Sequence, residues 1–272
     1  MIIDGTARYD PTFWGAVNCT DKDYFSDPGI NCSGLKTIKS KSAYHYHMFE
    51  KIDYSKDTEA FRIGSLIHAL VLGTPHISEF AVYDGKSKNS DKYREWFKTQ
   101  PEGTEAVLER ELETARKIYK YAYEQNDLIK MLKETAQHKE IAAFSDRLGY
   151  RTKAKADALY LPEGEEGDGI IWDVKTTNDL FEFYRDARKY GYHMGDVWYR
   201  DVFQSALKRR FDYRLIVIEK KYPYSVVDYN FSDRVLAQGR KWIDEAFAQY
   251  CVGFDSGVWA KPASKITLDW GY

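Results

Sequence analysis

The pattern of hydrophobic and polar positions changes along the chain, and each change predicts a different kind of element. Residues 1–31 show no clear period and predict an irregular arm. Over residues 32–135 apolar side chains recur every three or four positions, which is typical of helices. Residues 61–73 form a mostly apolar helix that Gly73, Thr74 and Pro75 should stop.

Three further helical stretches are expected in this part of the chain. Residues 33–49 predict one helix with Ser33 as a candidate N-cap. Residues 91–134 form a long, charged and amphipathic pattern, and a second helix is expected over residues 128–137. Residues 32–135 should therefore be mainly helical.

After residue 147 the hydrophobic positions recur every second residue, which is typical of strands. Residues 148–161 and 169–177 alternate, and the polar loop between them is rich in turn formers, so together they predict a β-hairpin. Later patterns predict two helices, a buried strand with a hairpin partner, and a last helix introduced by Ser232; these cover residues 179–192, 194–210, 213–222, 224–231 and 232–251. Asn178 and Asp179 are cap candidates for the first of these helices, and residues 253–272 should be an irregular tail.

This order of elements predicts an α+β (α/β) fold with a small mixed central β-sheet flanked by helices. A chain of 272 residues that shows no repeat and no low-complexity linker is expected to form one domain, with residues 136–252 as its core. Hydrophobic residues make up 43% of the chain, which is enough to bury such a core.

Charge and cysteine content narrow the class of protein. The net charge of −2 argues against a protein that merely coats nucleic acid, although a local acidic metal site with basic surroundings remains possible. Cys19, Cys32 and Cys251 form no C-x-x-C pair and are expected to be free thiols of a reducing compartment. Asp4 interrupts any secretory pattern, and no apolar run reaches the roughly 18–20 residues that cross a bilayer, so we expect a cytoplasmic protein.

The predicted hairpin carries the chemistry. Alternation places Asp173 and Lys175 on one face, while Trp172 and Val174 occupy an opposite, apolar face that packs on the core. Folding the hairpin symmetrically about Glu165 sets Asp157 opposite Asp173, with Cβ atoms about 4.5–5.5 Å apart. Two carboxylates that close repel each other unless a cation lies between them, and Mg²⁺ held by carboxylates and phosphate oxygens is the natural solution.

Lys175 fits the same chemistry, because a lysine beside a metal-bound water can orient it or stabilise charge on a phosphate. The alternative is that Asp-x-Lys is an ordinary surface ion pair. Glu140 is a candidate third carboxylate or a plain helix-end charge, and His68, four residues after Gly64, is a candidate ligand or a core histidine. Candidate phosphate-binding residues lie before Asp157 and at the end of a later helix: Arg151, Lys153, Lys155, Lys208 and Arg209.

Taken in order, these residues resemble the PD-(D/E)XK nuclease superfamily, with a particular likeness to its exonuclease VIII (RecE-type) branch of phages and prophages. The likeness runs from about residue 32 to residue 259. The residues that match the family's motifs are 64–68, Glu140, 156–157, 172–177, Tyr192 and His193, and Tyr199.

The resemblance implies a restriction-endonuclease-like core and a set of roles. Asp157, Asp173, His68 and the carbonyl of Val174 would hold Mg²⁺, for which Mn²⁺ can substitute, at one site or two. Lys175, Glu140 and Tyr199 would complete the catalytic set. Such enzymes degrade linear double-stranded DNA processively from the 5′ end, leave 3′ single-stranded tails, often form homo-oligomeric rings, and work beside a RecT-like single-strand annealing protein in the bacterial cytoplasm.

The chain departs from this family at Gly195, where a glutamine often stands four residues before the helix tyrosine. Two alternatives stay open: an endonuclease on the same core, and a non-catalytic DNA-binding protein on a decayed nuclease fold.

Overall fold

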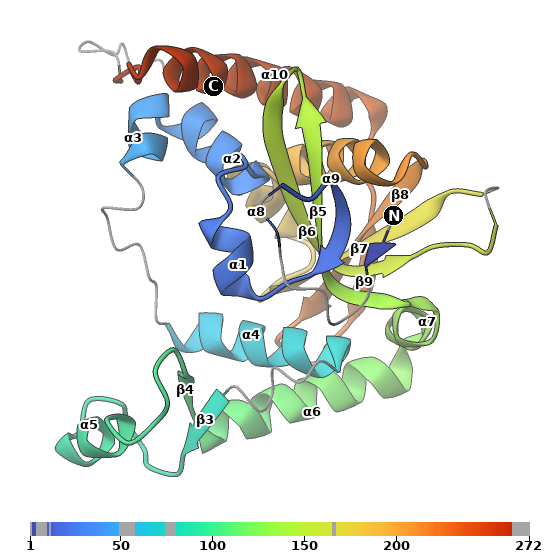
Figure 1. Ribbon diagram of the computed structural model, residues 1–272. Helices are drawn as coiled ribbons and strands as arrows, with labels where there is room; N and C mark the ends of the chain where they lie inside the picture. The colour runs from blue at the N-terminus through green and yellow to red at the C-terminus, as the bar shows by residue number, and fades with distance from the viewer. Residues whose placement is uncertain are drawn as a thin grey trace, which may run out of the picture.

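The computed structural model of the chain is a mixed α+β fold, in which a central sheet is covered by helices on both faces (Figure 1). The structure describes residues 2–3, 10, 12–48, 58–73, 80–164 and 167–262. The predicted fold class and the mixed central sheet are confirmed.

Within the described residues the central sheet has seven strands, in the order β1-β2-β5-β6-β7-β8-β9. Their bounds are β1 Ile2–Ile3, β2 Gly15–Asn18, β5 His138–Arg147, β6 Tyr150–Tyr160, β7 Gly169–Thr177, β8 Phe211–Glu219 and β9 Val226–Tyr229. The β7–β8 pair is parallel, which requires a crossover, and two helices supply it. A separate parallel pair consists of β3 Phe80–Tyr83 and β4 Glu105–Leu108.

The helices are mostly those that the periodicity predicts. Their bounds are α1 Asp21–Ser26, α2 Cys32–Ser40, α3 Ala43–His47, α4 Glu59–Leu72, α5 Asp91–Phe97, α6 Glu109–Gln125, α7 Asp127–Thr135, α8 Phe183–Lys189, α9 Tyr192–Leu207 and α10 Asp233–Ser256. Gly73 ends α4 in the left-handed conformation expected of a C-cap, while Thr74 and Pro75 lie outside the described residues.

The prediction of an irregular N-terminal arm is wrong. Residues 1–31 contain β1, β2 and α1, and β2 lies in the sheet between the edge strand β1 and β5. Ala16 and Val17 are buried there, so this short strand gains its stability from its place in the sheet and not from a pattern of its own.

Several helix boundaries also differ from the prediction. The amphipathic stretch 91–134 is divided among α5, β4, α6 and α7, because residues 105–108 pair with β3. The predicted helix 33–49 is two helices that break at Lys41, and Asn31, not Ser33, caps the first. The tail begins later than expected, since α10 extends to Ser256; residues 263–272 lie outside the described part.

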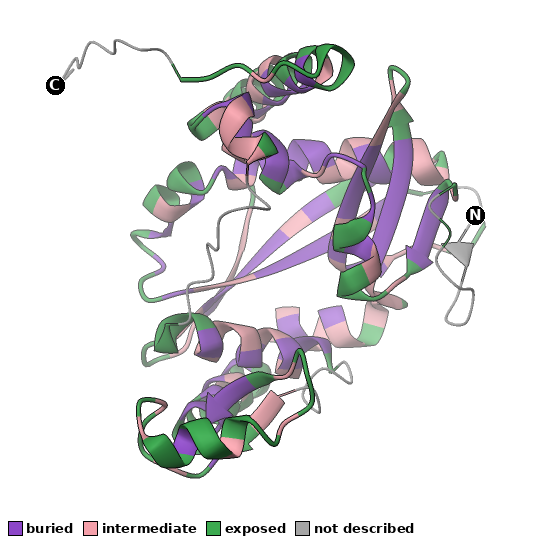
Figure 2. Ribbon diagram, turned by 60° about the vertical axis from the view of Figure 1, so that its left-hand side comes forward, coloured by how far each residue is buried: buried purple, intermediate pink, exposed green. Residues whose placement is uncertain are grey.

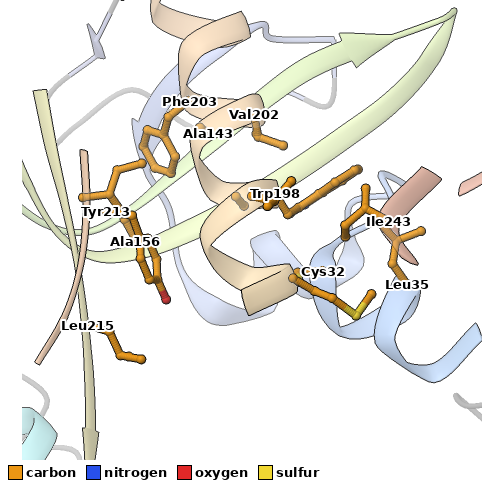
Figure 3. Packing of buried hydrophobic residues seen from close by; sticks show 14 of the residues in the cluster. Cys32, Leu35, Ala143, Ala156, Trp198, Val202, Phe203, Tyr213, Leu215 and Ile243 are labelled. Carbon is orange, nitrogen blue, oxygen red and sulfur yellow. The ribbon is translucent and has the colours of Figure 1, made fainter. Parts of the chain in front are cut away.

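Both faces of the central strands are buried (Figure 2), which corrects the expectation of one apolar and one polar face. On one face the α9 core unites α2, α9 and α10 with the sheet and includes Leu35, Trp198, Phe203 and Ile243 (Figure 3). On the other, the α4 core unites α4, α6 and α7 and includes Leu66, Ile118 and Leu132. Ile171 packs into the α9 core, while Trp172 and Val174 pack into the α4 core.

Candidate active site

The hairpin of β6 and β7 has the predicted register. Tyr160 pairs with Ile170 and Ala158 with Trp172, so the ladder is centred on position 165 as expected. The ladder ends at the pair of Ala158 and Trp172, so Asp157 is the first residue of β6 beyond it. There the Asp157 carboxylate accepts a hydrogen bond of 2.6 Å from the Val174 backbone N–H. Asp157 therefore lies beside the strand that carries Asp173 and Lys175.

A third carboxylate comes from β5, a strand that the sequence did not predict. Lys139 pairs with Ala158 and Ile141 with Ala156, so Glu140 lies between two pairs and faces Asp157 across the ladder. The φ angle of Glu140 is 50°, in the left-handed region that non-glycine residues rarely adopt. A strained residue at this point of the sheet distorts β5 next to Asp157.

The fourth side chain, His68, comes from α4. Its Nε2 atom lies 3.1 Å from Asp157 Oδ2. The helix approaches β7 closely at Gly64, where a Cβ atom would lie 3.1 Å from Thr176 Oγ1. The missing side chain at Gly64 thus lets α4 bring His68 to the carboxylate.

Lys175 binds three oxygen atoms of this cluster. Its Nζ donates to Asp173 Oδ1, lies 3.2 Å from the Val174 carbonyl oxygen and lies 3.9 Å from Asp157 Oδ2. The other oxygen of Asp173 accepts from the Tyr213 hydroxyl of β8. The lysine ammonium is thus held by two carboxylates and a carbonyl at the point where β6 and β7 separate.

Burial and opposite charges shift the pKa values of this cluster in different directions. Burial favours the neutral carboxyl of Asp157, but His68 and Lys175 outweigh it and lower its pKa well below the usual range. For Asp173, burial with the nearby Asp157 charge outweighs Lys175 and raises the pKa. Burial opposes the charged forms of His68 and Lys175, yet attraction to the carboxylates raises both pKa values.

The donor set fits a hard divalent cation. Carboxylate and carbonyl oxygens are the ligands that Mg²⁺ prefers, and the three oxygens around Lys175 already surround one positive charge. Among the described residues, no three His, Cys, Asp or Glu side chains converge as a complete metal cluster. Mg²⁺ usually keeps waters and phosphate oxygens as further ligands, so two carboxylates and a carbonyl are a sufficient protein contribution.

The cluster opens into a pocket of about 730 Å³ between α4 and the α8–α9 turn. His68, Glu140, Val174 and Lys175 all line it. A strand of a linear polymer that enters this pocket would meet the side chains of His68, Glu140 and Lys175.

Not all of the basic residues that were predicted to bind phosphate have side chains available for such a contact. Lys153 is buried, and its Nζ donates to the backbone oxygens of Tyr24 and Asp27, each at 2.6 Å. Arg151 pairs with Asp27 at 2.8 Å. Both side chains hold α1 and its flanking turn against the sheet, and this position does not fit a contact with phosphate.

The remaining basic candidates have mixed surroundings. Lys155 pairs with Asp21, and Arg209 donates to the backbone oxygens of Pro162, at 2.9 Å, and of Gly164. Lys208 is exposed at the end of α9 and lines a different pocket, of about 670 Å³. Their contact with DNA stays a prediction.

Helix α9 carries Tyr199, but Gly195 stands at the position four residues earlier where a glutamine was expected from the family resemblance. The Tyr199 ring stacks on the ring of Tyr213, with centroids 6.0 Å apart. The hydroxyl of Tyr213 in turn donates to Asp173. Gln204, five residues later, lines the pocket at the far end of α9. A Cβ atom at Gly195 would make only ordinary van der Waals contacts, 3.7 Å or more away, with Tyr213, Lys36 and Tyr199, so the backbone here is packed but leaves room for a small side chain.

Sequence reasoning missed Tyr213 and gave Tyr192 no role. Tyr213 reaches Asp173 because β8 lies parallel to β7 with Tyr213 paired to Ile171. The Tyr192 ring lies 6.0 Å from Lys175 Nζ. Alternation in β8 could have placed Tyr213 on one face of the strand, but nothing in the pattern shows which strand is its neighbour.

These features define a nuclease-like α+β domain, and the chain belongs to the family described as a PDDEXK-like domain of unknown function (DUF3799), which matches residues 31–267. The fold is similar to the crystal structure of a protein from Eubacterium rectale named "Putative exonuclease", with a TM-score of 0.64. The two chains are 14% identical over 89% of this chain and 88% of that one, a likeness that shows the fold alone. No curated protein matches the chain. Among the described residues no helix is long and apolar enough to cross a membrane.

Proposed function

We propose that the protein is a metal-dependent nuclease that hydrolyses phosphodiester bonds of DNA at the Asp157–Asp173–Lys175 cluster. One observation carries this proposal: the Lys175 ammonium is bound by the two carboxylates and the Val174 carbonyl, at the rim of an open pocket. Such a set provides oxygens for a divalent cation together with a fixed positive charge for a phosphate.

The residues have distinct roles in this proposal. Asp157, Asp173 and the Val174 carbonyl would hold the cation, which supplies an activated water and neutralises phosphate charge when bound. His68 orients Asp157 from α4, and the Tyr213 hydroxyl orients Asp173 from β8. Lys175 stabilises the charge that develops on the attacked phosphate, and Glu140, opposite Asp157 in the strand register, adds a carboxylate to the wall of the pocket.

We further propose that the substrate is linear double-stranded DNA, degraded from the 5′ end with Mg²⁺. The RecE-type sequence likeness supports this, and the name of the E. rectale protein of similar fold, "Putative exonuclease", agrees with an exonuclease. By the same likeness the enzyme would act processively, as a homo-oligomeric ring, and pass 3′ single-stranded tails to a RecT-like annealing protein.

The test compares linear and covalently closed circular duplex DNA, with the linear form labelled at either the 5′ or the 3′ end. Release of the 5′ label from linear DNA in Mg²⁺, and none in EDTA, is expected. Cutting of closed circles would show an endonuclease instead, and DNA binding without cleavage under every metal tried would show a decayed site.

A further inference from the structure

A second hollow adjoins the main pocket at Lys175. It has a volume of about 480 Å³ and is formed by α2 and the start of α9. Lys175, Tyr190 and Tyr192 line both hollows, so the two meet at the catalytic lysine. The walls of the second hollow include Lys36, Thr37, Ser40, Lys189 and Tyr199.

The two hollows differ in charge. Among the described residues, four carboxylates line the main pocket: Asp21, Glu105, Glu140 and Asp186. Among the described residues that line the second hollow, the only carboxylate is that of Asp173, which already binds Lys175, while Lys36 and Lys189 add two ammonium groups. Neither Lys36 nor Lys189 forms an ion pair with any carboxylate in the described part of the chain. The second hollow is therefore a cationic cleft with hydroxyl groups on its walls.

Lys36 is held toward the catalytic site. Its ammonium lies 5.4 Å from the centre of the Tyr192 ring, and Lys175 lies 6.0 Å from the same ring. Its Nζ also lies 3.8 Å from the place a Cβ atom of Gly195 would take. The lysine from α2 thus packs next to the backbone of α9 at Gly195.

Helix α9 adds positive potential at the same place. Its N-cap is Gly191, with φ 61° and no side chain to cap the first N–H groups, and its first turn contributes Tyr192 and Gly195 to the walls. The N-terminus of a helix carries a partial positive charge that favours anions. Two lysines, hydroxyl groups and a helix N-terminus are a suitable set for phosphate.

We propose that this cleft, with Lys36 as its main ligand, binds a phosphate group of the DNA strand next to the phosphate at Lys175. The inference rests on the proposed function and names a substrate contact for it. The group is either a terminal phosphate monoester or an internal phosphodiester of the strand. In both cases Lys36 positions the strand for cleavage without taking part in the bond-breaking step.

The test measures DNA binding in EDTA, where no cleavage occurs, by fluorescence anisotropy over a series of salt concentrations. The probes are linear duplexes with a 5′-phosphate or a 5′-hydroxyl, competed with a closed circle. The variants are Lys36→Gln and Lys36→Ala, with Lys120→Ala as the control, because Lys120 is an exposed lysine of α6. Melting temperatures confirm that each variant is folded.

The logarithm of the DNA association constant falls linearly with the logarithm of the salt concentration. Loss of one phosphate contact should make this slope less steep by about 0.9 for both Lys36 variants, with no change for the control. A loss of affinity confined to the 5′-phosphate duplex identifies a terminal monoester, and an equal loss on all probes identifies an internal diester. A slope and affinity equal to those of the control would overturn the proposal. If the salt dependence changes with Lys36 but the protein never cleaves DNA, the phosphate-binding cleft is supported and the proposed nuclease activity is rejected.

Discussion

At the residue scale the candidate site depends on a few charged side chains that are largely buried and pair with one another. Lys175 binds oxygens of Asp157, Asp173 and Val174, and each carboxylate has a second donor of its own, the Val174 N–H or the Tyr213 hydroxyl. Because a buried charge must be paired or hydrogen-bonded, each member fixes the position of the others. This mutual dependence explains how a short Asp-x-Lys segment can become a defined site.

Glu140 combines a functional carboxylate with an unfavourable backbone, and substitution can separate the two. Glu140→Gly should lose DNA cleavage, as should Glu140→Ala. At φ 50° glycine is unstrained whereas alanine is not, so the glycine variant should be more stable by about 1 kcal/mol. Chemical denaturation measures this difference, and an alanine variant as stable as the glycine variant would show that the backbone is not strained there.

Asp196, in α9, provides a pH-dependent prediction away from the metal ligands. Burial raises its pKa from 3.8 to about 6, although Arg200 opposes the shift. The folded state therefore holds this proton more tightly than the unfolded chain, so the free energy of unfolding should fall as pH rises from about 4 to about 6. The fall attributable to Asp196 should be up to about 3 kcal/mol.

The comparison that isolates this group is urea denaturation of the parent and Asp196→Asn across that pH range. Asparagine cannot ionise, so the variant should gain stability relative to the parent as pH rises. Parallel pH profiles for the two proteins would contradict the shifted pKa.

At the scale of elements, the site forms where β6 and β7 stop pairing and α4 approaches. The close contact between Gly64 and Thr176 sets the distance from His68 to Asp157. A side chain at Gly64 should therefore move α4 and affect chemistry more than stability.

Gly64→Ala is expected to reduce the cleavage rate by about tenfold, since small displacements of positioning groups have large effects on rate. Its free energy of unfolding should change by less than about 1 kcal/mol, because the helix preference of alanine offsets the contact with Thr176. Gly64→Ala with Thr176→Ala should recover most of the rate. A double variant as slow as the single one would show that this contact does not position His68.

The elements also show what could be predicted from the sequence. Alternation and the symmetric loop were enough to predict the register that brings Asp157 beside Asp173, because side-chain parity in a hairpin is strict. The strand β2 was not predicted, since its stability comes from β5, which lies far away in the chain. The strand β5 was missed although it pairs with the next strand, β6, because its central residues 141–144 are all apolar and do not alternate. Like β2, Tyr213 and Lys36 could not be predicted: each reaches the site through a tertiary contact.

At the scale of the whole molecule, the sheet separates two cores, and the candidate site lies between them. His68 belongs to the helix of the α4 core, while Tyr213 and Tyr199 pack with the α9 core. A cation bound at the site would therefore link both halves in the folded state only and should stabilise the whole domain.

Mn²⁺ should raise the melting temperature of the parent protein, with a gain of about 2.7 kcal/mol when the metal is at a hundred times its dissociation constant. Asp157→Ala removes one ligand and should lose most of this gain, whereas Lys120→Ala should retain it. Calorimetric titration of the same variants checks that the effect is binding. An equal rise in melting temperature for Asp157→Ala would exclude Asp157 as a ligand.

The most direct test of the central claim is the release of labelled nucleotide from linear duplex DNA by the parent and by Asp173→Asn, with Mg²⁺ or EDTA. Asparagine keeps the shape of the side chain but removes the charge that binds Lys175 and the cation. We expect release by the parent in Mg²⁺ alone, and a loss of at least about a hundredfold in the variant, since one preorganised charge contributes that much to rate. Cleavage by Asp173→Asn at the parental rate, or equal cleavage in EDTA, would contradict the assignment of this cluster as the active site.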